Sequence, residues 1–150
     1  MITHWLSAKR GIILSMLALC LCSCTSIRLI SAYDEITDKN ISALQEKVSG
    51  FFVEIKEVIG TEQAQYKHYN SFYRDVKTAL EGLQIRANAI DKNELVQQQL
   101  VLLAQQLADL ETLHKKGFSN TAVLQSAQEA CNRSFTAIIR LQLALKRGEK

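Results

Sequence analysis

The residue pair Glu111 and His114 has the spacing of a metal-binding Glu-x-x-His motif. Residues three apart lie on the same face of a helix, so the carboxylate and the imidazole would point the same way. In di-iron four-helix bundles, such pairs supply ligands to two buried metal ions. Those sites need a second Glu-x-x-His motif and two further glutamates, and this sequence has no second motif. We therefore interpret the pair as a surface feature near a helix end and expect no metal or dissociable cofactor.

Other sequence signatures of catalysis are missing as well. The chain has no Gly-rich phosphate loop, no nucleophile elbow, no haem-attachment motif and no Cys or His set with zinc-binding spacing. Lys and Arg together number 18 against 15 for Asp and Glu, which lacks the strongly basic character of nucleic-acid-binding domains. We expect neither an enzyme nor a nucleic-acid-binding protein.

The first 23 residues have the composition of a secretory signal. Lys9 and Arg10 precede an apolar run over residues 11–21, and small residues follow it. The run is shorter than the roughly 18 apolar residues expected of a transmembrane helix. We expect residues 1–23 to be a signal peptide that is cleaved from the mature protein.

The tetrapeptide Leu21-Cys22-Ser23-Cys24 closes this segment. It resembles the lipobox of bacterial lipoproteins. In its general character the sequence also resembles small helical lipoproteins of Gram-negative bacteria. The resemblance implies cleavage before Cys24, diacylglycerol on its sulfur and an acyl chain, such as palmitate, on its new amino group. Thr25, in place of aspartate, implies the outer membrane, with the protein lipid-anchored on the periplasmic side. An ordinary secretory signal that is rich in cysteine is the alternative.

Cleavage and lipidation would leave Cys131 as the single free cysteine. The mature protein would then have no disulfide within the chain. A lone cysteine on an apolar helix face is most often a small buried residue, and a reactive thiol is the less favoured alternative.

The rest of the chain has the composition of a helical domain, without proline and with six glycines. Apolar residues recur every three or four positions in four runs, over residues 41–58, 66–90, 96–113 and 123–145. Turn signals separate the runs: Gly60-Thr61, 91–93 and 115–119. We predict an all-α, antiparallel four-helix bundle with up-down-up-down order over residues 34–150, behind a short tether over residues 24–33. Two helical hairpins that complete their core only in a dimer are the alternative.

The third run has no charged residue between positions 95 and 108. Val101 and Leu102 widen its apolar stripe beyond one face, whereas a helix of a monomeric bundle normally has one charged face. We consider two interpretations equally: a deeply packed helix with glutamines on its polar side, or a contact surface for an envelope protein or a second copy of the chain.

Aromatic residues gather around the junction of the first two runs. Phe52, Phe72 and Phe118 are the members that the apolar stripes explain least, so they are candidate partner-binding residues. Ordinary core packing is the favoured interpretation of the aromatic group as a whole.

The C-terminal residues Lys146, Arg147 and Lys150 form a basic end. In an antiparallel bundle whose first helix leaves the membrane, this end returns toward the membrane, where basic side chains would contact anionic headgroups. The alternative is that these cations only complement the dipole of their own helix.

Two classes of function are compatible with these features. The first is a membrane-anchored, periplasm-facing lipoprotein that acts as a structural or protein-interaction module of the cell envelope. The second is a helical module that binds a small ligand or a cell-wall glycan between its helices, for which a cavity near the tyrosines is expected.

Overall fold

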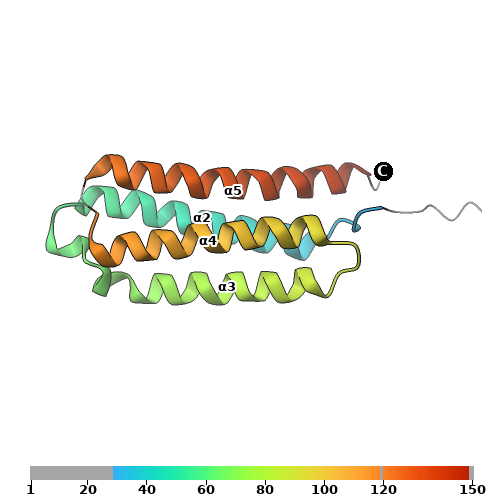
Figure 1. Cartoon of the computed structure of the whole chain (residues 1–150), viewed down its shortest axis with the longest axis horizontal. Helices are drawn as coiled ribbons and strands as arrows, with labels where there is room; N and C mark the ends of the chain where they lie inside the picture. Colours follow the sequence, from blue (N-terminus) through green and yellow to red (C-terminus); the bar gives the residue numbers. More distant parts are fainter. Residues whose placement is uncertain (1–28, 119, 149–150) are drawn as a thin grey trace, which may run out of the picture.

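A computed structural model of the chain describes residues 29–118 and 120–148. The predicted leader, Cys24, Ser119 and Lys150 lie outside the described residues. Four long helices dominate the described chain (Figure 1). They are α2 (Glu35–Val58), α3 (Asn70–Asn88), α4 (Glu94–Lys116) and α5 (Thr121–Gly148), and two 3-10 turns, η1 (Glu62–Ala64) and η2 (Tyr66–Tyr69), precede α3.

The helices pack as a four-helix bundle in which each contacts its two neighbours. Helix α2 packs against α3 and α5, and α4 packs against the same two helices from the opposite corner. Consecutive helices run in opposite directions (Figure 1), so the predicted all-α, up-down-up-down bundle is confirmed. The described chain enters the bundle and leaves it at the same end, which we call the tether end. The opposite end, with both 3-10 turns, is the distal end.

The core of the bundle comes from the apolar stripes that the sequence predicts. Most of the repeating residues of the four runs are buried, and they form one continuous cluster. The members that are at most 2 % exposed include Ile41, Leu44, Val48, Ile55, Val76, Leu83, Val96, Leu100, Leu103, Leu110, Leu124, Cys131, Phe135 and Ile138. Burial of this apolar surface, at about 25 cal/mol per Å², is the main force that holds the helices together. Cys131 is a free, buried thiol, and burial raises its pKa to about 11.

The first helix begins with a side-chain cap and ends at a glycine. Asp34 is the N-cap of α2, and its carboxylate accepts a hydrogen bond of 2.9 Å from the Thr37 amide. Gly60 has φ +85°, a conformation that glycine adopts without steric cost. Thr61 also closes α2, because its hydroxyl donates back to the Val58 carbonyl at 2.7 Å.

The second helix starts later than the sequence predicts. Tyr66 and Tyr69 belong to the 3-10 turn η2, and the α-helix begins at Asn70. Their regular spacing reflects contacts with the core and not one continuous helix. The turn before α4 is tight, as expected, and residues 115–117 stop α4 with Gly117 at φ +83°. Asn120 caps α5, since its side chain accepts a hydrogen bond of 2.9 Å from the Val123 amide.

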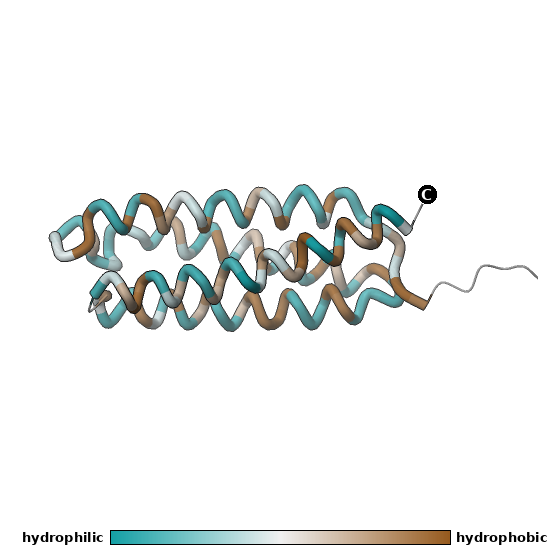
Figure 2. The backbone as a smooth tube through the Cα atoms, turned by 90° about the horizontal axis from the view of Figure 1, so that it is seen from above, coloured by the Kyte–Doolittle hydropathy of each residue, from teal (hydrophilic) through white to brown (hydrophobic). Residues whose placement is uncertain are grey.

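The hydropathy of the residues along each helix agrees with the bundle. Apolar and polar residues alternate along every helix, and the tube is strongly apolar where the described chain begins (Figure 2). Within residues 29–118 and 120–148, none of the helices combines the length and the apolar character needed to cross a bilayer.

Candidate functional site

His114 is almost fully buried at the distal end, with 1 % of its surface exposed. Its Nδ1 lies 2.9 Å from the Tyr73 hydroxyl, and its Nε2 lies 2.8 Å from the Ala64 carbonyl. Because a carbonyl can only accept, Nε2 carries the proton and Nδ1 accepts from the tyrosine. Burial lowers the pKa of His114, although the hydrogen bond to Ala64 raises it. The net lowering favours the neutral imidazole.

Aromatic rings surround this imidazole. The Phe118 ring stacks on His114 with centroids 4.8 Å apart, and Tyr69 lies at 5.1 Å. Phe51 and Tyr66 lie at 5.6 and 5.8 Å. The two 3-10 turns bring the Ala64 carbonyl and two of these rings to the end of α4. His114 is therefore the central residue of an aromatic cluster that joins the α2–α3 connection to the bundle.

Glu111, one turn earlier on α4, is 6 % exposed. Its carboxylate contacts Lys77 at 2.7 Å and Lys115 at 2.9 Å, and it accepts a hydrogen bond of 2.7 Å from the Tyr66 hydroxyl. Burial by itself raises the pKa of this carboxyl, but the two lysines and the tyrosine outweigh it and lower the pKa to about 2. The group is thus charged at neutral pH and held by three partners.

The interpretation of Glu111 and His114 as a surface feature is wrong, because both side chains are buried. The predicted stripe of α4 passes through Leu113, which is only partly buried, and the structure places His114 inside instead. Both ring nitrogens of His114 already have partners. In the part of the chain that the structure describes, no three His, Cys, Asp or Glu side chains come together as a potential metal site.

The three aromatic residues proposed for partner binding lie in or against the core. Phe52 is fully buried at 0 % exposure, so its side chain is not available to a partner in this conformation. Phe72 stacks on Phe51 with centroids 4.4 Å apart, and Phe118 stacks on His114. Helix α2 packs against both α3 and α5, so a broader arc of α2 is buried than one stripe predicts.

The outward face of α4 does expose apolar side chains. Val101 is 61 % exposed and Leu102 is 55 % exposed, in the segment without charged residues. Leu95, in the first turn, is 50 % exposed. The opposite face of α4 is deeply packed, and the rest of the described chain leaves Val101 and Leu102 uncovered, so their role as a contact surface stays a prediction.

A network of hydrogen bonds fixes the chain where it enters the bundle. The Ser31 amide donates to the Lys92 carbonyl at 2.9 Å, and the Ser31 hydroxyl donates to the Asn93 side chain at 2.9 Å. Arg86 donates through Nε and Nη2 to the two oxygens of Asp34, each at 2.6 Å, and this holds the pKa of that carboxyl well below its usual range. We call these residues the clasp. Ser31 thus joins the tether to the α3–α4 turn.

Two of the three basic C-terminal residues are described, and they lie at the same end. Lys146 and Arg147 are exposed in the last turn of α5, and the Lys146 ammonium lies 5.1 Å from the centre of the Tyr33 ring. The end of α5 is therefore next to the segment that leads to Cys24.

Two hollows adjoin the distal cluster between α3 and α4. One, of about 340 Å³, is lined largely by polar residues that include Tyr66, Asn70, Arg74 and Lys77. A smaller apolar slot of about 60 Å³ shares Tyr73, Lys77 and Glu111 with it. The larger hollow is open, since seven of its eight lining residues come from η2 and α3 and only Glu111 comes from α4. It lies near the tyrosines, where a ligand-binding module was expected to have a cavity, and ligand binding there stays a prediction.

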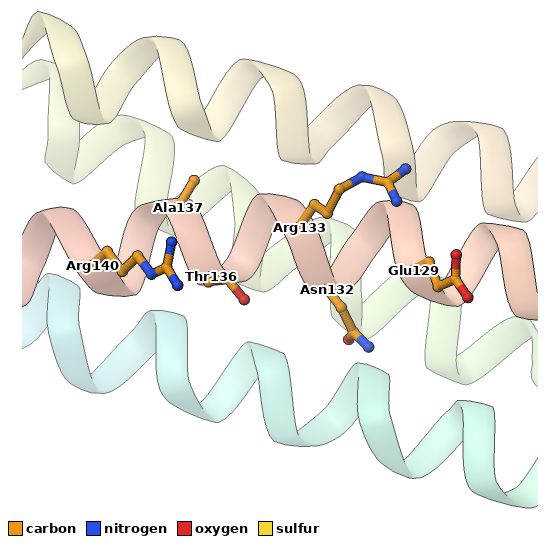
Figure 3. Close-up of a pocket in the computed structure, with 6 residues that line it drawn as sticks. All are labelled: Glu129, Asn132, Arg133, Thr136, Ala137 and Arg140. Carbon is orange, nitrogen blue, oxygen red and sulfur yellow. The ribbon is translucent and has the colours of Figure 1, made fainter.

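A further shallow hollow lies on the outer face of α5 (Figure 3). All of its lining residues come from this one helix, so it is an open surface between side chains and not a cleft between elements. The lining residues are Glu129, Asn132, Arg133, Thr136, Ala137 and Arg140.

Sequence reasoning missed the partners of the two buried polar residues of α4. Tyr73 lies within the apolar run predicted over residues 66–90, and nothing in the sequence singles out Lys77. The signal for them exists only in the combination of two helices, since 41 residues separate Tyr73 from His114. The comparison of the chain with protein-family models, with curated proteins and with solved structures gives no match in any of the three.

Proposed function

We propose that the protein is a membrane-anchored lipoprotein of the bacterial envelope, held through acylated Cys24 in the outer membrane and facing the periplasm, and that it acts as a structural or protein-interaction module. The anchor follows from the lipobox resemblance of residues 21–24. Several acyl chains on one residue give the kind of stable attachment that a single chain does not.

The observation that supports the interaction role best is the exposed, uncharged face of α4. Val101 and Leu102 are more than half exposed in the middle of a segment without a single charge. Interface centres are depleted of charged residues, and apolar contact there excludes water from the partner. An envelope protein or a second copy of the chain is the expected partner. Catalysis is not part of the proposal, because His114 and Glu111 are already engaged by neighbouring groups.

Site-specific photocrosslinking in intact cells tests the interaction role. A photoreactive amino acid at Leu102 should give a discrete adduct with one envelope protein or with the chain itself. The same amino acid at Thr136, an exposed position on the outer face of α5, should give none and serves as the matched control. No adduct from Leu102, or the same adducts from both positions, would contradict the proposed role of α4.

The hollow next to Tyr66 and Tyr73 favours a second candidate function, the binding of a small polar ligand or a cell-wall glycan. Its volume of about 340 Å³ is at the lower end of the range of roughly 300–1,000 Å³ for ligand pockets. Titration with soluble peptidoglycan fragments, followed by NMR, would show saturable shifts of residues around Asn70 and Lys77 if this function holds. Unchanged spectra at millimolar fragment would exclude these glycans as its ligand.

A further inference from the structure

The exposed large apolar residues of the bundle are concentrated at the tether end. Each of the four helices exposes one of them within two turns of that end: Ile36 of α2, Ile85 of α3, Leu95 of α4 and Leu143 of α5. Their exposed fractions range from 43 to 65 %. We call these four residues the apolar collar.

The positions of the collar residues along their helices place them at similar heights. Ile36 and Leu95 are the second residues of α2 and α4, while Ile85 and Leu143 precede the last residues of α3 and α5 by three and five positions. At 1.5 Å of rise per residue, all four lie within about 8 Å of their helix ends. Ile30, in the chain that enters the bundle, is 48 % exposed at the same end.

The distal end has no such ring among the described residues. Val53 is the exposed large apolar residue there, at 62 %, five residues before the end of α2. In Figure 2 the tube is apolar at the point where the described chain begins. The tether end therefore exposes more large apolar side chains than the distal end does.

We propose that the tether end of the bundle dips into the headgroup layer of the membrane, with the collar residues in contact with lipid. The collar has one member on each of the four helices, and these helices form the four sides of the bundle. A protein partner would cover one or two of these sides, whereas a bilayer surrounds the whole end. Apolar side chains of peripheral proteins typically enter the membrane by about 5–10 Å, which matches the height of the collar.

The chain before the bundle places this end near the membrane. The inference rests on the proposed lipid anchor at Cys24, which lies five residues before Leu29. Five residues span at most about 18 Å even when fully extended. The clasp holds Ser31 against the α3–α4 turn, so the chain enters the bundle in the middle of the collar and not along its side.

The charged residues between the collar positions set the depth. Glu35, Glu94 and Arg147 are exposed at the same end, and charged groups are costly in the hydrocarbon core but remain solvated among headgroups. Lys146 and Arg147 contribute favourable contacts to anionic lipids there. Because these charged residues lie nearer to the tip of the bundle than the collar residues beside them, the whole end stays at the level of the headgroups, and the collar contacts the lipid there.

Tryptophan fluorescence of the lipidated protein in vesicles tests this placement. The sequence has a single tryptophan, Trp5, within the expected leader, so a tryptophan placed in the bundle reports its own position. Ile85→Trp and Leu95→Trp probe the collar. Val53→Trp, an equally exposed apolar position at the distal end, is the matched control. The vesicles contain phosphatidylethanolamine and phosphatidylglycerol, with or without lipids brominated near the headgroup end of their acyl chains.

The proposal expects both collar tryptophans to be blue-shifted and to lose most of their emission in brominated vesicles, while Val53→Trp is unchanged. If the protein floats with the vesicles but no position is quenched, the collar is refuted and the anchor stands. Quenching at all three positions would mean that the bundle lies flat, which also overturns the proposal. A blue shift at Leu95→Trp without quenching would indicate a protein contact instead. Protein that does not float with the vesicles refutes both the anchor and the collar.

Discussion

Replacement of Glu111 by glutamine should destabilise the bundle in a way that depends on pH. The pKa of this carboxyl is lowered from 4.5 to about 2 by Lys77, Lys115 and Tyr66, against the effect of burial. At about 1.4 kcal/mol per pH unit, this lowering corresponds to about 3 kcal/mol in favour of the folded state. Both lysines are more than half exposed, so solvent screening reduces the expected contribution to about 2 kcal/mol.

The sign of the pH dependence follows from the direction of the shift. The Glu111 carboxyl has a lower pKa in the folded state than in the unfolded state. Its ionised form therefore contributes fully to the unfolding free energy above about pH 5. As the pH falls from 4.5 toward 2, the unfolded chain takes up the proton first and the contribution disappears. The difference in unfolding free energy between the parent and Glu111→Gln should therefore be about 2 kcal/mol at pH 7 and less than half of that at pH 3.

Urea unfolding of the purified protein, followed by circular dichroism at 222 nm, measures this difference. Glu46→Gln, which removes an exposed carboxylate on α2, is the matched control and should change stability by less than about 0.5 kcal/mol at either pH. A Glu111→Gln effect that is equal at the two pH values, or no larger than that of the control at pH 7, would refute the electrostatic role assigned to Glu111.

Three further predictions concern buried groups. Tyr73→Phe leaves Nδ1 of His114 without its donor and should lower the unfolding free energy by about 1–3 kcal/mol, measured by urea titration; an unchanged midpoint would contradict the hydrogen bond. Phe52→Ala should cost about 3–5 kcal/mol, and Val53→Ala next to it less than about 1 kcal/mol, by thermal unfolding; equal costs would place Phe52 outside the core. The buried Cys131 thiol, whose pKa is raised to about 11, should react with iodoacetamide only when the bundle is unfolded in urea; rapid labelling of the native protein would contradict its burial.

The helices were predictable because local signals agree along the chain. The repeat of Ile41, Leu44 and Val48 determines which face of α2 is buried, and Gly117 ends α4 within the turn predicted over residues 115–119. Apolar residues spaced three and four apart lie on the buried face of a helix, so the all-α class of the fold could be inferred from their spacing.

The distal cluster was not predictable from such local signals. Burial of His114 depends on the Ala64 carbonyl and the Tyr73 hydroxyl, which come from a 3-10 turn and from another helix. Phe52 shows the same limit, because it lies beside the stripe and is buried in a bundle where α2 packs against two helices. At the tether end, the sequence indicated a short tether but not that Ser31 joins it to Asn93. In each case a contact between distant segments decides which face of the helix or tether is covered.

The modification of Cys24 is the central claim, because both the proposed function and the placement of the collar depend on it. Mass spectrometry of the N-terminal peptide, from protein expressed in a Gram-negative host and extracted from its membranes, measures it directly. We predict a peptide that begins at Cys24 and has the added mass of diacylglycerol and one further acyl chain, and we predict that Cys24→Ser yields no such peptide. A peptide that begins at another residue, or an unmodified Cys24 in the mature protein, would contradict the account.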